Sequence, residues 1–367
     1  MKNTFGNNIS LTIFGESHGN AIGAVIDGLA PGIPVDEAKI SELLSLRRPA
    51  GKISTARREE DKFVIESGVF EGFTTGTPIC ILIPNENTQS KDYSATRPLA
   101  RPSHADYTAY EKYHGYEDYR GGGHFSGRIT AALVAAAGIL IPALEAKGIY
   151  IGTRIKSIAG VCDRDFVDFE QDIKTVSEKN FPVFSADIEE KMQEKILEAA
   201  KDGDSVGGIL ETAVIGLPRG LGEPWFDTLE GTISHTVFSV PAIKGIEFGA
   251  GFSVAEMRGS EANDTMRMEN GQVKMQSNVN GGIVGGIANG APLIFRCAVK
   301  PTPSIFKEQK TVNFVEGKDA DLTLTGRHDP CIVHRAAVVV RAVTALALAD
   351  QLATRYGTDW LSGGTKK

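Results

Sequence analysis

The chain of 367 residues is 41% hydrophobic and 23% charged, which is typical of a globular protein with room for one large domain or two ordinary ones. Its formal net charge of −7 argues against a general nucleic-acid binder, but a local arginine cluster still allows an anionic small molecule to bind. The four cysteines are far apart and form no C-x-x-C pair, which disfavours a disulfide framework and a zinc site and favours a reducing cytoplasm. The N-terminus has no apolar core, which disfavours a signal peptide.

The pattern of apolar residues and turn signals predicts strands and helices in a mixed order. Asp36 is a predicted N-cap, followed by Ile40, Leu43 and Leu44 on one apolar face. In chain order, we expect strands at 8–14 and 21–27, a helix at 36–47, strands near 62–70 and 79–83, a helix after Ser103, a long helix at about 127–147, a strand near 149–159, a helix at about 186–201, a strand near 208–216, a helix near 224–239, a strand at 292–299 and a final helix at about 334–355.

This order lacks the regular alternation of strand and helix that a doubly wound sheet needs, so we expect the α+β class. No repeat and no linker is visible, and residues 1–355 are therefore expected to form a single domain, followed by a short mobile tail at 356–367. The longest apolar run, residues 131–142, is rich in alanine and too short to span a membrane, so it predicts a buried helix.

The stretch FGESHG, residues 14–19, matches the G-x-S-x-G elbow of serine hydrolases and suggests Ser17 as a nucleophile. That elbow requires a strand before the serine and a helix immediately after it, whereas the residues after Gly19 have a strand pattern. The residues that precede the motif are also too few to form the sheet that supports such an elbow. The hydrolase interpretation is therefore disfavoured, and it is kept as the alternative from another enzyme class.

Other generic nucleotide and metal motifs are missing from the sequence. It contains no G-x-G-x-x-G, no Walker A loop and no H-E-x-x-H. This disfavours a dinucleotide-binding fold, a P-loop kinase and a zincin, and no metal site is expected.

Arginine and histidine side chains gather instead in glycine- and proline-rich segments. The planar fork of arginine suits carboxylate and phosphate, so several converging arginines predict a multiply anionic substrate. The arginines and histidines at predicted turns or helix ends are Arg47, Arg48, Arg57, Arg58, Arg97, Arg101, His104, Arg128, Arg327 and His328.

Two glycine-rich segments have the composition of a phosphate or cofactor site. The segment GGGHFSG, residues 121–127, precedes a predicted helix, so its backbone N–H groups and the helix dipole can bind phosphate. The segment NGGIVGGIANG and the KPTPS after the next strand can line a cofactor, with Lys300, Ser304 and Arg327 holding its phosphate. Ordinary glycine turns remain the alternative for both segments.

The chain resembles the chorismate synthase family in six motifs that occur in the family's order. They are FGESHG, RRP, RPSHADYTAYEKYHGYEDYRGGG, GGIVGGIANG, KPTPS and GRHDPC. Each motif alone is a weak signal, but together they extend over nearly the whole chain. The resemblance implies a single catalytic domain with a β-α-β sandwich fold, in which helices surround two antiparallel sheets. It also implies a cytoplasmic homotetramer.

Members of that family complete the shikimate pathway of aromatic amino-acid biosynthesis. They are carbon–oxygen lyases acting on phosphates: they eliminate phosphate and a ring proton, anti and 1,4, from 5-enolpyruvylshikimate 3-phosphate (EPSP) to give chorismate. The reaction requires reduced FMN although it has no net redox change. The resemblance therefore implies EPSP as substrate and FMNH2 as cofactor, with NADPH involved only indirectly, through flavin reduction.

The resemblance also implies residue roles at matching positions. His18 of GESH would protonate the leaving phosphate, and His104 of RPSHAD would protonate the reduced flavin or balance its charge. Asp329 of GRHDPC would accept the ring proton, while Ser17 and Ser126 would hydrogen-bond within the substrate and flavin site. The implied clamp for the phosphate and two carboxylates of EPSP consists of Arg47, Arg48, Arg57, Arg101, Arg128 and Arg327.

The implied FMN contacts include one departure from the family's pattern. Many members have Arg-Ser-Ser-Ala-Arg after the glycines, where this chain has His-Phe-Ser-Gly-Arg at 124–128. A permanent charge and a hydroxyl are therefore missing, and contacts there would be backbone-mediated, or His124 would serve a phosphate only when protonated. The implied contacts are His124, Phe125, Ser126, Gly285, Lys300, Pro301, Thr302, Pro303, Ser304 and Arg327.

Two questions stay open at this point. A flavin- or anion-binding protein without turnover is the non-enzymatic alternative to a lyase. Reduced flavin can come from intrinsic NADPH oxidation or from a separate flavin reductase, and the missing dinucleotide fingerprint favours the separate reductase. Neither a nucleic acid nor a membrane is expected as a partner.

Overall fold

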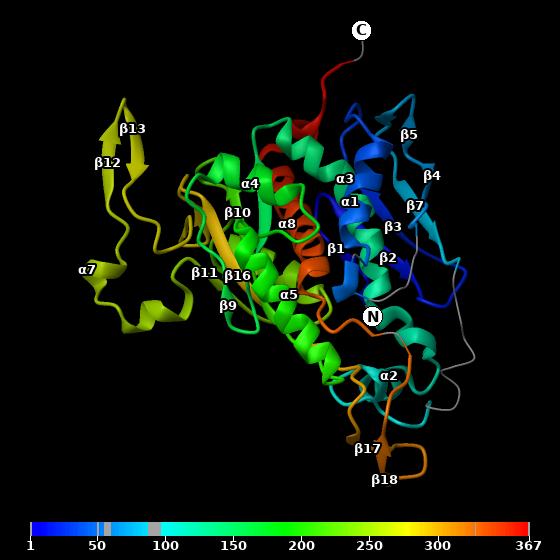
Figure 1. The fold of residues 1–367 in the computed structure, drawn as a ribbon. Coiled ribbons are helices and arrows are strands. Elements are labelled where there is room, and N and C mark those ends of the chain that lie inside the picture. The colour runs from blue at the N-terminus through cyan, green and yellow to red at the C-terminus, as the bar shows by residue number, and fades with distance from the viewer. Residues whose placement is uncertain (1, 50, 55–59, 87–96, 327, 366–367) are drawn as a thin grey trace.

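The computed structural model describes residues 2–49, 51–54, 60–86, 97–326 and 328–365 (Figure 1). Its framework is a pair of five-stranded sheets, and all strand pairings among these residues are antiparallel. The first sheet has the order β1-β2-β3-β7-β4, formed by Thr4–Phe5, Ser10–Gly15, Ala21–Asp27, Ile79–Pro84 and Val64–Ser67. The second has the order β11-β16-β10-β8-β9, formed by Ile243–Phe248, Leu293–Val299, Gly208–Ile215, Tyr150–Ile158 and Val161–Cys162.

Helices lie between the two sheets (Figure 1). Helix α3 (Thr130–Glu145) packs on β3 and β7 of the first sheet, α8 (Val333–Tyr356) packs on β8 and β10 of the second, and the two helices pack on each other. The α+β class is therefore confirmed. The β-α-β sandwich is confirmed as well: α3 and α8 form the layer between the sheets, because both are apolar around most of their circumference and need protein on all sides.

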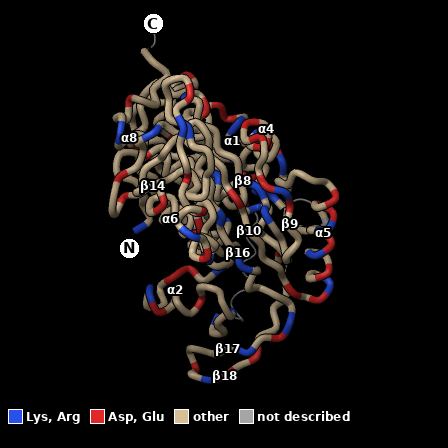
Figure 2. The backbone as a smooth tube through the Cα atoms, turned by 90° about the vertical axis from the view of Figure 1, so that its left-hand side faces the viewer, with Lys and Arg blue, Asp and Glu red and all other residues tan. Residues whose placement is uncertain are grey.

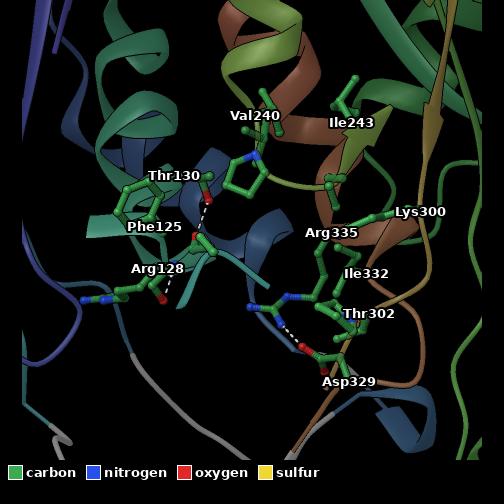
Figure 3. A pocket seen from close by; sticks show the side chains of 18 of the residues that line it. Phe125, Arg128, Thr130, Val240, Ile243, Lys300, Thr302, Asp329, Ile332 and Arg335 are labelled. Carbon is green, nitrogen blue, oxygen red and sulfur yellow. Dashed lines mark hydrogen bonds and ion pairs between the residues drawn. The ribbon is translucent and has the colours of Figure 1, made fainter. Parts of the chain in front are cut away.

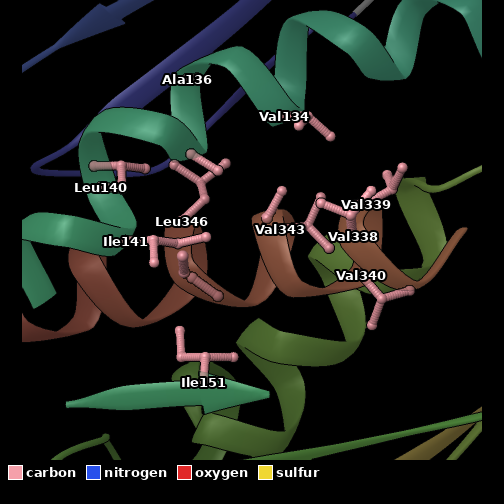
Figure 4. Packing of buried hydrophobic residues seen from close by; sticks show 14 of the residues in the cluster. Val134, Ala136, Leu140, Ile141, Ile151, Val338, Val339, Val340, Val343 and Leu346 are labelled. Carbon is pink, nitrogen blue, oxygen red and sulfur yellow. The ribbon is translucent and has the colours of Figure 1, made fainter. Parts of the chain in front are cut away.

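The contact between α3 and α8 consists of small and branched apolar side chains (Figure 4). Val134 and Ile141 of α3 are buried with Val343 and Leu346 of α8, and Ile151 of β8 lies on the opposite side of α8. Each fully buried aliphatic side chain of this kind stabilises the fold by about 1.5–3 kcal/mol. One continuous core therefore joins both sheets.

Two helical segments are long and apolar enough to cross a membrane, Gly127–Glu145 and Val333–Tyr356. Of their most apolar stretches, 83% and 100% respectively are buried inside the protein. The burial identifies both as core helices, and the prediction of a buried helix over 131–142 is confirmed.

Helix α1 (Glu37–Arg47) begins as predicted, because the Asp36 carboxylate accepts hydrogen bonds from two N–H groups of its first turn. Its apolar face packs on α3 at Gly138, where an added Cβ would lie only 2.6 Å from Cγ1 of Ile40. This close approach requires glycine. It fixes the direction of α1, whose last turn carries Arg47 towards the centre of the molecule.

The predicted boundaries differ from the structure in a few places. The strand expected near 62–70 is divided into β4 and β5 (Val69–Phe70), because Gly68 between them has a φ of +82°. Helix α6 (Leu229–Ser239) begins later than predicted, since the Thr228 side chain caps it and the preceding residues form a separate turn. Helix α4 (Phe169–Ser177) has no counterpart among the predicted elements. The remaining predicted elements are present as α2 (Asp106–Tyr113), α5 (Ala186–Lys201), β8, β10, β16 and α8.

An arm of residues 251–281 projects from the second sheet (Figure 1). It contains α7 (Gly259–Ala262) and the hairpin β12–β13 (Met266–Glu269 and Gln272–Met275). The Asp264 carboxylate closes its base by accepting hydrogen bonds from the backbone N–H groups of Val279 and Asn280. No strand or helix was predicted for this region, and the structure shows regular elements in it. Exposed apolar side chains on the arm are Phe252, Val254, Met266, Met268 and Val273.

A second small hairpin holds α2 in place below the helices (Figure 1). It consists of β17 (Gln309–Asn313) and β18 (Lys318–Leu322), and the N–H group of Ala100 donates to the carbonyl of Val312 at 3.3 Å. The ring of Phe314 lies 4.8 Å from that of Tyr110 on α2. These contacts place the segment from Arg101 to α2 against the rest of the fold.

The C-terminal segment after α8 packs against the protein over its described residues, and the mobility expected for the tail at 356–367 stays a prediction. Leu361 is buried, and the Ser362 hydroxyl donates to the carbonyl of Pro31. The Trp360 ring stacks on Tyr356. Apolar anchoring of Leu361 and Trp360 supplies the order, and the last two residues lie outside the described part.

Surface charge of both signs is mixed along α5 (Figure 2). Charged residues also lie on β8, β10 and β16, inside the second sheet (Figure 2). The acidic total of the chain is therefore spread over its surface, and local groups of charge inside the fold need separate explanations.

Candidate active site

A cavity of about 690 Å³ lies beside the central helices, a volume within the roughly 300–1,000 Å³ of ordinary ligand pockets. Six cationic side chains and two carboxylates are among its described lining residues. The lining therefore carries four more positive than negative charges, although the whole chain totals −7. The cations are Arg47, Arg48, Arg128, Lys244, Lys300 and Arg335, and the carboxylates are Asp61 and Asp329.

Two of the predicted substrate-binding arginines meet at one carboxylate. Arg47 at the end of α1 and Arg128 before α3 both form ion pairs with Asp61, and the Arg47–Asp61 distance is 2.9 Å. All three side chains are buried. Burial alone would raise the pKa of the Asp61 carboxyl, but the two guanidinium charges hold it below its usual range. A carboxylate that stays charged there fixes both arginines at the cavity wall.

A third arginine lies on the opposite side of the cavity (Figure 3). Arg335 in the first turns of α8 pairs with Asp329, and its Nε also donates to the backbone carbonyl of Arg47 at 2.8 Å. Asp329 and Arg335 both line the cavity, so the carboxylate that was predicted to accept a proton is held by a cation at the wall.

Ser17 and His18 lie in the turn between β2 and β3, against the glycine-rich segment 121–123. The Ser17 hydroxyl is 3.0 Å from the carbonyl oxygen of Gly121 and 3.1 Å from His18 Nδ1. Because a carbonyl can only accept, the hydroxyl hydrogen points to the backbone and Nδ1 donates to Ser17 Oγ. An added Cβ on Gly121, whose φ is +60°, would lie 2.1 Å from the His18 ring, so only glycine fits.

The hydrolase alternative fails on this geometry. Ser17 is followed by strand β3, which pairs with β2 as a hairpin, whereas an elbow requires a helix at that point. The serine hydroxyl also donates to the backbone, and the neighbouring His18 faces it as a donor. No base is therefore placed to activate Ser17.

The ring of His104 packs against Gly122, the glycine that follows Gly121 in the same turn. An added Cβ on Gly122 would lie 3.2 Å from Cε1 of His104 and 3.4 Å from its Nε2. The other ring nitrogen, Nδ1, lies 2.6 Å from the Asp106 carboxylate, which also pairs with Arg101 at 2.7 Å. Adjacent glycines thus bring together two histidines that are 86 positions apart in the sequence.

Residues 124–126, where the chain departs from the family's usual sequence, all line the cavity. His124 Nδ1 donates to the carbonyl of Gly15 at 2.8 Å, which leaves Nε2 as its second nitrogen. Phe125 packs edge-on against Tyr113, with ring centroids 6.0 Å apart. Ser126 Oγ caps the following turn by accepting from the N–H group of Arg128 at 3.3 Å.

The KPTPS segment follows β16 and contributes Lys300, Thr302, Pro303 and Ser304 to the cavity. Lys300 Nζ donates to the carbonyl of Ser103 at 2.6 Å, and burial together with the nearby Lys244 lowers the pKa of Lys300. The Thr302 hydroxyl is buried and has no hydrogen-bond partner among the described residues.

The structure brings most of the predicted site residues to one place. Ser17, His18, Arg101 and Pro301 do not line the cavity, although the first three lie in the layer directly behind its wall. Gly285 is not near it, because Gly286 contacts Leu229 at the start of α6 while the cavity takes its residues from the other end of that helix. Arg57 and Arg327 lie outside the described residues.

Several residues of the site were not predicted from the sequence. Asp106 stands within the quoted motif RPSHAD, whereas Asp61, directly after Glu60, lies in none of the quoted motifs. Arg335 lies six residues after Asp329, close to two helical turns away. The segment 238–244 between α6 and β11 had no recognisable signal, since its residues are mostly apolar.

Comparison with known proteins identifies the same family throughout. A sequence model of the family described as chorismate synthase matches residues 9–353. The chain is 48% identical to the chorismate synthase of Chitinophaga pinensis and 46% identical to that of Thermococcus gammatolerans, in each case over 95% of this chain and 96% of the relative. A crystal structure of chorismate synthase superimposes with a TM-score of 0.76 at 28% identity, covering 96% of this chain and 94% of that one.

Proposed function

The chain belongs to the chorismate synthase family, and we propose that its cavity binds EPSP and reduced FMN for the family's elimination reaction. The protein is a lyase of aromatic amino-acid biosynthesis, which converts EPSP to chorismate and phosphate in the last step of the shikimate pathway. The roles of individual side chains in ligand binding and proton transfer are proposed from their positions in the site.

The main observation behind the proposal is that cationic side chains outnumber carboxylates in the cavity lining. EPSP brings a phosphate and two carboxylates, and charge-assisted hydrogen bonds from forked guanidinium groups suit both. Arg47 and Arg128 share Asp61, the Nε of Arg47 is buried without a hydrogen-bond partner among the described residues, and Arg48 lines the same wall. We assign the substrate to this end of the cavity. Arg57 and Arg327 are proposed as further clamp residues on the family's pattern.

The apolar part of the cavity lining supports FMN as the second ligand. Phe125, Val240 and Ile243 offer an apolar surface for a ring system, and the orphaned hydroxyl of Thr302 offers a donor next to Lys300 (Figure 3). Together with residues 124–126 and 301–304, these groups would hold the cofactor. Reduced FMN, when bound, supplies electron density that helps the C–O bond break and recovers it afterwards, so no net redox change occurs.

Side chains of the protein are proposed to donate and accept the protons of the reaction. His18, held at Nδ1 by Ser17, is proposed to protonate the leaving phosphate, whose developing charge would otherwise make it a poor leaving group. Asp329, held by Arg335, is proposed to receive the ring proton. His104 is proposed to balance or protonate the reduced cofactor. Ser126 positions the start of the segment that carries Arg128.

The test is anaerobic turnover. Purified protein is mixed with EPSP and chemically reduced FMN, and the release of chorismate and of phosphate is followed together. We expect equal amounts of both products, and none with oxidised FMN. Binding of EPSP and FMN without release of either product would contradict the proposal and favour a binding protein.

We further propose that the protein works in the cytoplasm and receives reduced flavin from a separate reductase. The absence of a dinucleotide fingerprint in the sequence supports this. Under anaerobic conditions, NADPH and oxidised FMN should give no chorismate until a flavin reductase is added. Turnover with NADPH alone would instead assign the reductase activity to this chain.

Exposed apolar side chains support a homotetramer. Trp225 and Phe226 are 85% and 96% exposed, and Phe252 on the arm is 84% exposed. Large exposed aromatic side chains of this kind mark surfaces that contact other proteins. Light scattering should give a mass of about 157 kDa, four times the 39.3 kDa of the chain, and a monomer mass would contradict the assembly.

A further inference from the structure

The carboxylate of Asp106 accepts hydrogen bonds from two residues of the preceding loop. Its Oδ2 accepts from the backbone N–H of Arg101 at 3.0 Å and from Nε of the same residue at 2.7 Å. Its Oδ1 accepts from Arg101 Nη2 at 2.7 Å and lies 2.6 Å from His104 Nδ1. Asp106 is the first residue of α2, so the helix fixes the position of this carboxylate.

These contacts determine where the imidazole of His104 carries its proton. Burial would raise the pKa of the Asp106 carboxyl, but hydrogen bonds from Arg101 and His104 hold it well below its usual range, so both oxygens only accept. Nδ1 must therefore be protonated in order to donate to Oδ1. The nearby Nη2 of Arg101, 3.1 Å from Nδ1, is itself only a donor and cannot replace Asp106 in this role.

The remaining ring nitrogen is on the side of the glycine turn. Nε2 lies where a Cβ on Gly122 would be 3.4 Å away, and Gly122 lies two residues before His124, where the segment that lines the cavity begins. His104 itself lines the cavity. The loop that carries it is held from the other side by Lys300, which donates to the Ser103 carbonyl. The ring is thus anchored at Nδ1 and presents Nε2.

We propose that Asp106 is a positioning residue which keeps the Nδ1 proton on His104 and makes Nε2 the atom that exchanges a proton with the cavity's occupant. In this exchange the imidazolium form of His104, which carries a proton on each ring nitrogen, loses the proton on Nε2 to the acceptor in the cavity, and the ring becomes neutral with Nδ1–H in place. Asp106 gains no proton at any stage. The inference rests on the proposed role of His104 and adds the residue through which that role is set.

The first test compares turnover of Asp106→Asn, Asp106→Glu, His104→Ala and the double variant Asp106→Asn/His104→Ala with the unaltered protein, under the anaerobic assay above. An asparagine amide can donate to Nδ1 and so favours the opposite tautomer. We expect Asp106→Asn to lower kcat about 100-fold while KM changes less than about threefold. Asp106→Glu should stay within about tenfold of the unaltered protein.

The double variant separates action through His104 from action through Arg101. If Asp106 acts through His104, the double variant is no slower than His104→Ala, because the interaction is already lost. A further loss of about 100-fold in the double variant would assign the effect to Arg101 and overturn the proposal. Unchanged kcat in Asp106→Asn would also overturn it.

Asp172 provides a matched control. Its carboxylate forms a fork with Arg164 at 2.7 and 3.0 Å and accepts from a backbone N–H at 2.9 Å, as Asp106 does with Arg101, but it contacts no histidine. Asp172→Asn should destabilise the fold by an amount similar to Asp106→Asn and leave kcat unchanged. Equal loss of activity in both variants would show a purely structural effect.

A second readout does not depend on turnover. Nitrogen-15 solid-state spectra of histidine-labelled protein distinguish Nδ1–H from Nε2–H tautomers, and the signal of His104 is identified among the seven histidines by its absence in His104→Ala. We expect the Nδ1–H form, and a change in Asp106→Asn. A missing Nδ1–H signal in the unaltered protein would overturn the inference. An unaltered protein that shows this tautomer but no turnover would contradict the proposed function instead.

Discussion

Two buried clusters of arginine and carboxylate have the same chemistry but different surroundings. In the second sheet, Arg154 is fully buried and pairs with Glu211 at 2.6 Å and with Asp165 at 3.2 Å, and the Phe166 and Phe184 rings lie 5.3 Å from its guanidinium carbon. At the cavity, two arginines share one carboxylate, Asp61. The first cluster has more carboxylates than arginines, and the second has more arginines than carboxylates.

The comparison teaches that burial of charge alone does not identify a site. A buried cation whose charge is already balanced by carboxylates has no surplus charge to attract another anion, and its loss should affect stability. A cluster with surplus cations at a cavity wall can bind an anionic ligand, and its loss should affect turnover. The arginines are buried in both cases, so the balance of charges and access to the cavity make the difference.

The largest effect should come from the two histidines beside the glycine turn. His18→Ala and His104→Ala should each lower turnover about 10²- to 10⁴-fold, because each removes a proton-transfer group. The free energy of unfolding should change by less than about 1 kcal/mol, measured by urea denaturation. His235→Ala is the control, since His235 packs edge-on against Phe5, does not line the cavity, and its loss should leave activity unchanged. Full activity of either site variant would refute the role assigned to that residue.

On the structural side of the comparison, Glu211→Gln should destabilise the fold by about 3–5 kcal/mol. The substitution leaves Arg154 buried with only the exposed Asp165 as a charged partner. Turnover per folded molecule should stay within about twofold at low temperature. The double variant Arg154→Leu/Glu211→Leu should recover most of the stability, because no unpaired charge remains. A fall in kcat with unchanged stability would reverse the distinction between the clusters.

His334 on α8 lies outside both clusters and is buried in its neutral form. We expect it to lower the free energy of unfolding at acidic pH. Burial, together with the nearby charge of Arg335, lowers the pKa of His334 to about 4, against an ordinary value of about 6.5. At a pH between these two pKa values, His334 is protonated in the unfolded chain and neutral in the folded protein. Stability is therefore full above pH 6.5 and falls as the pH decreases towards 4, by on the order of 3 kcal/mol in total.

Urea denaturation at several pH values checks this dependence. His334→Gln removes the group that titrates and should flatten the curve between pH 6.5 and 4. Carboxylates with lowered pKa values, such as Asp61, contribute only at lower pH. An unchanged slope in His334→Gln would assign the acid sensitivity elsewhere.

The smallest effect should come from Asp61→Asn, which tests the cavity cluster directly. Both arginines remain but lose the shared carboxylate that fixes them, so kcat/KM for EPSP should fall about 10- to 100-fold. Asp165→Asn is the counterpart in the second sheet, where the carboxylate is 72% exposed, and it should change stability by less than about 1 kcal/mol and activity not at all. Normal kcat/KM in Asp61→Asn would mean that the arginines are positioned without it.

Much of the fold was predictable because local patterns are decisive where elements are long and apolar. The residues of β3 were predicted without error, and α1 begins at its predicted cap, since an acidic N-cap and a one-sided apolar face act within a few residues. The helix α3 followed from an alanine-rich apolar run. The arm and the short strands lacked such patterns because their pairing depends on distant residues.

The sequence by itself determined the family, the α+β class and four of the six cationic residues that line the cavity in the described part of the chain, because motifs in a fixed order and strong local periodicity survive without any three-dimensional information. Only the tertiary structure decided that α3 and α8 lie between the sheets, that Asp61 joins Arg47 to Arg128, and that adjacent glycines bring His18 and His104 together. The physical reason is that these contacts join segments many residues apart. Their geometry follows from packing of the whole chain, which no local pattern encodes.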